Sequence, residues 1–413
     1  MEVIHARCAG LDVHKDTVVA CVRIMKDGQV HQEVKTFRTT TSDLLALSDW
    51  LRANECTHAA MESTGVYWKP VWHILEDSVT LVLANAMHIR NVPGRKTDVN
   101  DATWIADLLA HGLIRGSFVP PTPVQEMRDL SRTRKQLIRE AAQHSQRLQK
   151  TLEDANIKIG SFVSDILGVS GRAILEGIAK GITDPETLAD LGKGRLKASR
   201  SQLVEALRGH VREHHRFLLR LHLDQIDALD KAVREVEARL GKALDPFRDL
   251  EGLLTTIPGV SQTTAQVLLS EVGTDMSRFP TAANLISWAG LCPGNDESAG
   301  KRRSTRLRKG GQWLKATLVQ SAWSAARTKG SYLKALFQRI RARRGPKKAA
   351  IAVAASMLTA AYHMLKNGVV YEDLSERYVD TRDRTKVAKQ LIKRLANLGF
   401  EATVSPTPDT ALA

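Results

Sequence analysis

The stretch Cys8–Val22, CAGLDVHKDTVVACV, decides the fold of the N-terminal region. It is rich in apolar and β-branched residues and is interrupted at His14-Lys15-Asp16, which predicts a β-rich run with a turn at that point. A second turn signal, Asp27-Gly28, precedes an alternating run over Gln29–Arg38. This pattern predicts a further strand that follows in a hairpin.

Strands and helices alternate downstream of this hairpin. Ser42–Asn54 predicts a helix with Ser42 as its N-cap. His58–Met61 and Val79–Ala84 predict short buried strands, with a helix through Trp72 between them. Strands that alternate with helices after an initial hairpin indicate an α/β fold class, a mixed sheet flanked by helices.

From about Pro123 the sequence becomes long, charged and helical. Two apolar stripes have spacings of three and four residues, which predict a helical hairpin or a coiled coil. The stripes consist of Met127, Leu130, Leu137, Ala141, Leu148 and Leu152, and of Leu219, Leu223, Ile226, Leu229, Val233, Val236 and Leu240. A coiled coil in the middle of a chain more often pairs subunits than performs chemistry.

Leu253–Gly273 predicts two short helices joined at Pro258–Ser261. This arrangement resembles a helix-hairpin-helix motif, in which backbone amides at the second helix's N-terminus meet a phosphate. The match is partial, because Ser261 stands where that motif usually has its second glycine. A corner in a helical core is an equally good interpretation of so short a motif.

The positive charge of the chain is concentrated in one segment. The 413 residues carry a net charge of +15, from 60 basic and 45 acidic residues. Lys301–Lys348 contains 16 Lys or Arg and no Asp or Glu, so 44 basic and 45 acidic residues remain elsewhere. A dedicated basic segment is typical of a nucleic-acid-binding surface, although a solvated basic face is an alternative.

Other sequence features bound the cellular setting. The four cysteines form no C-x-x-C pair, which favours a reducing cytosol over a disulfide framework or a zinc site. Charges in the first 30 residues interrupt any apolar export signal. Ala349–Leu365 is short and too polar for a membrane span, so we expect a buried helix, no membrane partner and a cytoplasmic location.

Four carboxylates are candidate metal ligands. Asp12 lies inside the first strand, Glu62 ends a later strand, and Asp98 and Asp101 open a helical run. All-oxygen ligands suit Mg²⁺, and four such carboxylates can hold two divalent cations about 4 Å apart for phosphodiester chemistry. Each carboxylate also has a structural interpretation, as a strand-end cap or as an acid at a helix N-terminus.

Ser298 is a candidate nucleophile. It lies in the polar, Gly-bounded loop Pro293–Lys301, directly before the basic segment. A serine hydroxyl attacks a phosphate only when its proton is removed and cations stabilise the attacked group. The alternative is a turn serine, because turns favour Ser, Asn, Asp and Gly regardless of chemistry.

Six ordered motifs carry a family resemblance. Together they resemble the DEDD transposases of the IS110 insertion-sequence family, with the closest likeness to its IS1111 branch, from near residue 5 to near residue 400. The motifs are GLDVHKD (Gly10–Asp16), AMESTGVYW (Ala60–Trp68), GRKTDVNDA (Gly94–Ala102), IPGV (Ile257–Val260), WAGLCPGNDESAGK (Trp288–Lys301) and RKGGQWLK (Arg308–Lys315).

The resemblance implies a specific domain organisation. Residues 1–125 would form a RuvC-like, RNase-H-fold domain that carries the acidic tetrad Asp12, Glu62, Asp98 and Asp101. Residues 126–248 would form a helical coiled-coil region for oligomerisation. Residues 249–370 would form a mainly helical transposase domain with the nucleophile Ser298, and residues 371–413 a terminal helix and tail.

The resemblance also implies an activity and partners. Ser298 would attack DNA in a Mg²⁺-dependent strand exchange, with two ions in each composite site of a homodimer that assembles to a homotetramer. A structured non-coding guide RNA, the bridge RNA, would pair with donor and target DNA. The expected phosphate-binding residues are Lys301, Arg302, Arg303, Arg306, Arg308 and Lys309.

Two other functions remain open at this stage. A RuvC-type metal-dependent nuclease would leave free 5′-phosphate and 3′-hydroxyl ends and form no covalent adduct with DNA. A non-catalytic nucleic-acid-binding protein would be indifferent to Asp12→Asn and to removal of metal.

Overall fold

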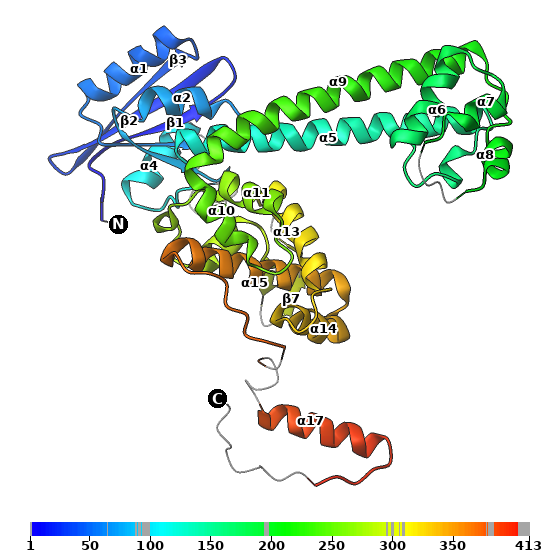
Figure 1. The fold of residues 1–413 in the computed structure, drawn as a ribbon. Coiled ribbons are helices and arrows are strands. Elements are labelled where there is room, and N and C mark those ends of the chain that lie inside the picture. The colour runs from blue at the N-terminus through cyan, green and yellow to red at the C-terminus, as the bar shows by residue number, and fades with distance from the viewer. Residues whose placement is uncertain are drawn as a thin grey trace. The chain divides into compact units, whose positions relative to one another are not determined.

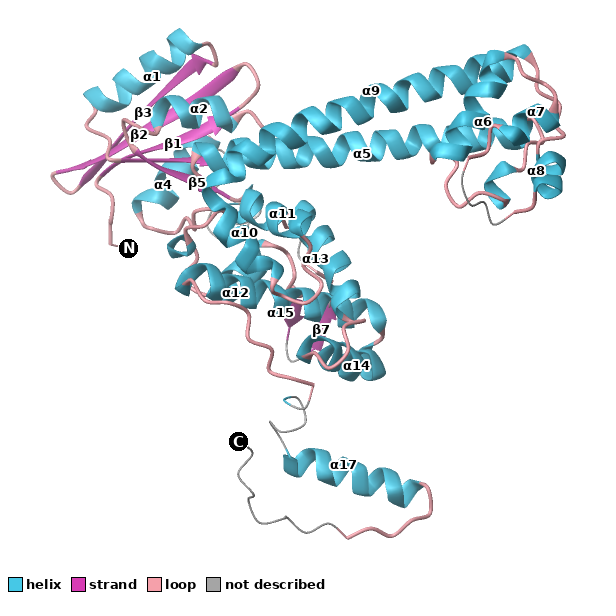
Figure 2. Ribbon diagram, in the orientation of Figure 1, coloured by secondary structure: helices cyan, strands magenta, loops and turns pink. Residues whose placement is uncertain are grey.

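The structure is a computed structural model of the chain, and it describes residues 2–63, 65–86, 89, 92, 100–193, 198–294, 296–298, 301–304, 306–307, 310–376, 378 and 384–403. The chain divides into two compact units, Met1–Val119 and Pro120–Ala413. The first contains a sheet, and the second is mainly helical (Figure 2). The predicted subdivision of the second unit at residues 248 and 370 stays a prediction.

The N-terminal unit is built on the expected mixed sheet. In the described residues its strand order is β3-β2-β1-β4-β5, with β1, β2 and β3 antiparallel and with β4 parallel to both β1 and β5. Its elements are β1 (Arg7–Val13), β2 (Thr17–Lys26), β3 (Gln29–Arg38), α1 (Thr41–Ala53), β4 (His58–Glu62), α2 (Trp68–Leu75), β5 (Thr80–Ala84) and α4 (Asp101–Ala110).

Local sequence signals explain the first elements of this unit. Asp27 and Gly28 have φ angles of 52° and 78°, the left-handed conformation that a two-residue hairpin turn between β2 and β3 requires. The predicted N-cap of α1 is wrong by two residues. Thr40, not Ser42, caps the helix, because its hydroxyl accepts a hydrogen bond from the Asp43 amide at 3.4 Å.

The two faces of the sheet are covered by different helices. On one face, Leu11 of β1 packs in a core with Leu47 of α1 and Val71 of α2. On the other face, Ala60 of β4 packs with Ile105 of α4. All five side chains are at most 1% exposed, so helices bury both faces of the sheet around β1 and β4, whereas the edge strand β3 is exposed along nearly its whole length.

Helix α4 rests directly on the backbone of β1. A Cβ atom at Gly10 would lie 2.1 Å from the carbonyl oxygen of Ala102 and 2.3 Å from the amide nitrogen of Ala106. Only glycine permits the approach of α4 at position 10, since a side chain there would meet helix backbone that cannot move aside. An ion pair also joins α4 to β2, because the buried guanidinium of Arg23 lies 3.1 Å from the carboxylate of Asp107.

A pair of long helices organises the second unit. Helices α5 (Thr122–Asp154) and α9 (Glu213–Leu244) lie side by side and antiparallel (Figure 1). Three side-chain contacts occur along their length in reverse order, Arg134 with Glu237, His144 with His222, and Asp154 with His215. The predicted helical hairpin is therefore present, and a coiled coil between subunits stays a prediction.

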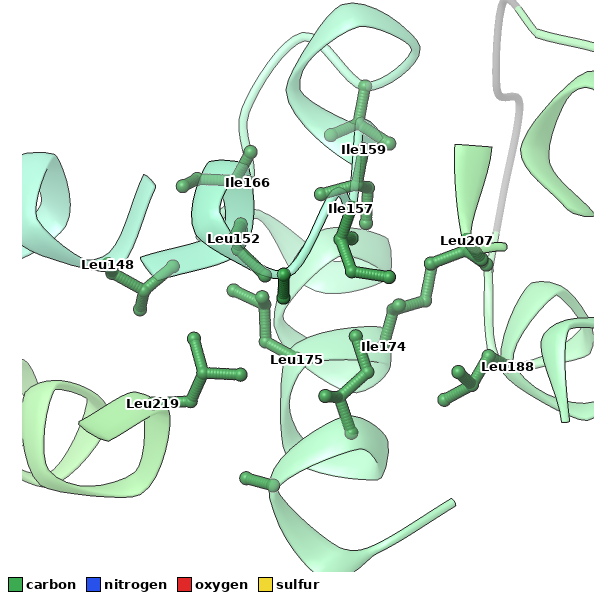
Figure 3. Close-up of a cluster of buried hydrophobic side chains, with 14 of the residues drawn as sticks. Leu148, Leu152, Ile157, Ile159, Ile166, Ile174, Leu175, Leu188, Leu207 and Leu219 are labelled. Atoms are coloured by element: carbon green, nitrogen blue, oxygen red, sulfur yellow. The ribbon is translucent and has the colours of Figure 1, made fainter. Parts of the chain in front are cut away.

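A separate hydrophobic core lies at one end of this helix pair. Leu148 and Leu152 of α5 and Leu219 of α9 meet Ile174 and Leu175 of α6 there (Figure 3). The chain between the long helices folds as η1 (Ile159–Ser161), α6 (Val169–Lys180), α7 (Pro185–Asp190) and α8 (Arg200–Ala206). Burial of these apolar side chains stabilises helices that are individually short.

The rest of the second unit consists mainly of short helices around α15. Its elements are η2 (Asp245–Phe247), α10 (Arg248–Thr255), α11 (Gln262–Val272), η3 (Met276–Arg278), α12 (Ala282–Trp288), β6 (Asp296–Ser298), β7 (Lys301–Ser304), α13 (Gln312–Ala325), α14 (Tyr332–Arg344), α15 (Pro346–Asn367) and α17 (Arg384–Asn397).

Helix α15 is the one candidate membrane span in the described residues, by length and composition, and half of its most apolar window is buried within the protein. It packs against α12, α13 and α14. The hydroxyl of Tyr362 on this helix donates a hydrogen bond to the carbonyl oxygen of Phe279 at 2.9 Å. These contacts agree with the expected core helix.

We predict that Gly10→Ala destabilises the N-terminal unit by about 1–3 kcal/mol, because the new methyl group overlaps the α4 backbone. Denaturant unfolding of the full chain, followed by far-UV circular dichroism, measures this loss. Gly116→Ala is the matched control in the same unit, because its Cβ would lie 3.5 Å from a Val82 methyl group, an ordinary contact. Equal stability of the two variants would contradict the close approach.

Candidate active site

The pairing of β1 with β4 brings two of the predicted carboxylates together. In the parallel register Gly10 lies beside Ala60 and Leu11 beside Met61, so the next residues in register are Asp12 and Glu62. Alternate residues of a strand point to the same face, which places Asp12 on the face of Gly10 and Glu62 on that of Ala60. This is the face covered by α4. The Asp12 side chain is 23% exposed, so solvent reaches it.

Helix α4 brings a third carboxylate to this region. Asp101 is its first residue, and Asn100 is its N-cap, with a side-chain oxygen that accepts from the Ala102 amide at 2.9 Å. The close contact of Ala102 with Gly10 holds this helix end beside β1, two residues before Asp12. An acidic residue in the first turn also interacts favourably with the helix dipole, so the structural interpretation of Asp101 holds as well.

The carboxylate side chains do not form a closed cluster. In the part of the chain that the structure describes, no group of three His, Cys, Asp or Glu side chains is close enough to hold a metal ion. Asp98, the remaining member of the predicted tetrad, lies outside the described residues. Like charges repel in the absence of a cation, which disfavours convergence of carboxylates. The fold thus brings the backbones of Asp12, Glu62 and Asp101 into one region, although their side chains do not converge.

The donor chemistry at this location fits a hard divalent cation. The three described candidates, Asp12, Glu62 and Asp101, offer only carboxylate oxygens, the ligand type that Mg²⁺ prefers. Cys8 lies on the same face of β1, but burial raises the pKa of its thiol to about 12. A thiol with this pKa is neutral near pH 7 and is a poor ligand for a soft metal.

His14 is a neighbour of the site that sequence reasoning missed. Its Nε2 lies 3.1 Å from Oδ2 of Asp12. The sequence predicted His14 as part of a turn, and it does follow the end of β1. The signal that could have found it is its spacing of two from Asp12, which places both residues on one side of an extended chain.

Ser298 lies in a hairpin, where the sequence predicted a polar loop. It is the last residue of β6, and its backbone pairs with Lys301 of β7 in an antiparallel register. The hairpin is extended by a bridge between Pro293 and Leu307. Two short strands with this pairing fix the position of the Ser298 backbone, whereas its side chain lies outside the described part of the structure.

The predicted phosphate-binding residues are described in part. Lys301 and Arg306 are exposed, and the Arg306 amide donates to the Ser304 hydroxyl at 3.2 Å. The side chains of Arg302 and Arg303 lie outside the described residues, as do Arg308 and Lys309 entirely.

The remainder of the basic segment forms α13, α14 and the beginning of α15. Cations in the last turn of α14 also interact favourably with the helix C-terminus, so part of the charge has a structural interpretation.

Comparisons with known proteins match both the carboxylate region and the serine region. A family model described as "Transposase", for the DEDD domain of IS110 elements, matches residues 9–157. A second, described as "Transposase IS116/IS110/IS902 family", matches residues 251–338. The chain belongs to the IS110 family of transposases. The first IS110-family segment contains all four members of the predicted tetrad, and the second contains Ser298.

A curated relative is similar over the first of these segments. The chain is 32% identical over 149 residues to "Insertion element IS110 uncharacterized 43.6 kDa protein" of Streptomyces coelicolor. The similar segment covers 36% of this chain and 36% of that protein. The likeness to this IS110 protein thus spans about a third of each chain.

We predict that Asp12→Asn and Glu62→Gln each weaken Mn²⁺ or Mg²⁺ binding at least about tenfold, because each removes an anionic oxygen ligand. Isothermal titration calorimetry of the full chain measures the affinity. Asp16→Asn is the matched control, because Asp16 is an exposed carboxylate in the turn between β1 and β2. Unchanged metal affinity in both site variants would remove these residues from the ligand set.

Proposed function

We propose that this chain is a transposase that catalyses RNA-guided, Mg²⁺-dependent, site-specific DNA strand exchange through a covalent serine–DNA intermediate. The observation that carries the proposal is the placement of Asp12 beside Glu62 in the β1–β4 register. Both positions lie near the N-terminal end of α4, whose first residue is Asp101. The strand order of the sheet is consistent with the RuvC-like RNase-H fold expected from the family resemblance.

The carboxylates have the role of metal ligands in this proposal. Asp12, Glu62, Asp98 and Asp101 would hold the cation. Mg²⁺ bound there would increase the reactivity of an attacking oxygen and stabilise the negative charge that develops on the phosphate. The N-cap Asn100 and the close contact of Gly10 with α4 orient the helix that bears Asp101.

Ser298 has the role of nucleophile. Its hydroxyl oxygen would form a bond to the scissile phosphorus, the bond from phosphorus to a sugar oxygen would break, and the serine proton would pass to the surrounding groups or solvent. The new phosphodiester conserves the energy of the broken bond, so a different strand end can later displace serine. Lys301, its hairpin partner, is an exposed cation that would offset phosphate charge.

A structured guide RNA would supply target recognition. When base pairing reads the sequence, the protein itself needs contacts to backbone and shape, as in other RNA-guided systems. The basic segment Lys301–Lys348 offers such contacts without an opposing acid. The proposed assembly is a homodimer that forms a homotetramer on donor and target DNA, in the cytoplasm.

We predict that Ser298→Ala abolishes a covalent protein–DNA adduct and lowers strand exchange by roughly 10³-fold or more, because the attacking oxygen is lost. Denaturing gel electrophoresis of labelled DNA after incubation with Mg²⁺ and guide RNA detects the adduct. Ser304→Ala in the same hairpin is the matched control and should retain it.

The same gels separate the alternative functions. A nuclease of RuvC type would cleave without an adduct, and its activity would persist in Ser298→Ala. A non-catalytic nucleic-acid-binding protein would show neither product, and Asp12→Asn would leave it unaffected. An adduct that persists in Ser298→Ala would show that another residue is the nucleophile.

We predict that the full-length protein, purified from cells that carry its complete element, retains one discrete small RNA encoded beside its gene. A folded guide would be bound in defined stoichiometry, whereas nonspecific charge would retain many RNAs. Sequencing of the RNA that remains after a high-salt wash distinguishes these outcomes. Recovery of bulk cellular RNA alone would contradict RNA guidance.

A further inference from the structure

The helical unit contains a cavity of about 360 Å³ whose lining combines polar and apolar side chains. Its walls include residues of four helices, with Arg132 and Lys135 on α5, Leu240 on α9, Thr263 and Thr264 on α11, and Trp313 on α13. Its volume lies at the lower end of the range for pockets that take small ligands, about 300–1,000 Å³. The combination of cations, hydroxyl groups and an indole is suited to a polar anion attached to a flat ring.

The cations of this region belong to one face of α5. Arg128, Arg132, Lys135 and Arg139 are separated by four, three and four residues, and we call them the α5 cationic stripe. The charged groups of Arg132, Lys135 and Arg139 lie 5.9, 5.9 and 5.3 Å from the Trp313 ring centroid. Three cations therefore lie within 6 Å of the centre of one partly exposed aromatic ring at the cavity.

Only part of this positive charge is neutralised. Glu271 is 1% exposed and accepts two hydrogen bonds of 2.8 Å from Arg132, and its carboxylate lies 3.4 Å from Arg128. Among the described residues of the cavity wall, it is the one carboxylate. Arg134, which also lines the cavity, is paired with Glu237. The buried carboxylate of Glu271 is thus shared by Arg128 and Arg132.

Lys135 and Arg139 are the members of the stripe without an ion pair in the described residues. The Lys135 ammonium donates to the Thr317 hydroxyl at 3.3 Å, and neither cation has a carboxylate within 4.0 Å in the described residues. Burial, followed by repulsion from Arg139, lowers the pKa of Lys135 below its ordinary value. An anion in the cavity would oppose both effects, because a nearby negative charge favours the charged form of Lys135.

The turn before α11 has a packing role on one side and borders this cavity on the other. A Cβ at Gly259 would lie 2.6 Å from backbone atoms of both Ser321 and Ala325, so the turn packs tightly on α13. Gly259 and Ser261 nevertheless also line the cavity. The turn at Pro258–Ser261 therefore acts as a corner of the helical core where it packs on α13. Its other side faces the cavity, where α11 is available to a ligand.

We propose that the cavity binds a phosphate of an unpaired nucleic-acid strand, with Lys135 and Arg132 as its ligands and Arg139 as a further source of positive charge. The cavity admits a single nucleotide but not a duplex, and the Trp313 indole offers a surface for an unpaired base. The proposal extends the nucleic-acid function proposed above to a second site, whose cations lie on α5, outside the segment Lys301–Lys348.

Lys135→Gln tests the proposal without any catalytic step. Binding of the full-length protein to labelled single-stranded DNA, RNA of the same sequence and duplex DNA is measured by fluorescence anisotropy in EDTA at several salt concentrations. We expect a roughly three- to tenfold loss of affinity for a single strand and a salt slope smaller by about 0.7, because one phosphate contact disappears.

Three variants make the result specific. Lys135→Arg should retain affinity because it keeps the charge, and Lys150→Gln, an exposed position on the same helix outside the cavity, should stay within about twofold. Arg139→Gln should reproduce the loss, and it replaces Lys135→Gln if that variant unfolds. The Arg139 guanidinium has no carboxylate partner in the described residues, so removal of this guanidinium leaves no buried carboxylate unpaired.

The outcomes separate the possible ligands. A loss for single-stranded DNA, RNA or both supports the proposal, and the strand that loses more affinity is the occupant. Unchanged affinity and salt slope, or a loss confined to duplex DNA, overturns it. Failure of the proposed strand exchange would leave this binding result intact, whereas an unaffected Lys135→Gln would leave the proposed reaction intact, so the two proposals fail separately.

Discussion

The close approach of α4 to β1 at Gly10 is the constraint on which the N-terminal unit depends. Helix backbone occupies the volume that a side chain would fill, so the beginning of α4 is held two residues from Asp12 along the strand. The Arg23–Asp107 ion pair holds the same helix to β2. The parallel register of β1 and β4 then places Glu62 beside Asp12. The Gly10 contact and the strand register together bring to one region three carboxylate positions that are far apart in the sequence.

In the second unit, one long helix performs different tasks along its length. Near its C-terminal end, Leu148 and Leu152 of α5 belong to a dry core with α6 and α9. Near its N-terminal end, the α5 cationic stripe faces Glu271 and Trp313. The first end is stabilised by apolar burial, and the second carries more charge than its neighbours neutralise. One continuous helix, α5, thus contributes both to the apolar core and to the cationic stripe.

The net charge of the chain does not reveal the α5 cationic stripe. Outside Lys301–Lys348 the chain is close to neutral, which made the basic segment the obvious phosphate-binding candidate. The structure shows cations that lie together within that neutral remainder. Arg128 and Arg132 share the buried carboxylate of Glu271, whereas Lys135 and Arg139 form no ion pair in the described residues. Coulomb interactions act over a few ångströms, so local arrangement decides anion binding more than net charge does.

The sequence alone predicted features that arise from short-range physics. Turn residues with left-handed φ, alternation in strands and helical spacing placed β1 to β3, α1 and the long helix pair, and the ordered motifs indicated the family. Only the tertiary structure decided the alignment of Asp12 with Glu62, the contact of His14 with Asp12, the hairpin at Ser298 and the cavity beside Trp313. These depend on contacts such as Arg132 with Glu271, which are 139 residues apart, and no local pattern of dihedral angles or periodicity specifies such pairs.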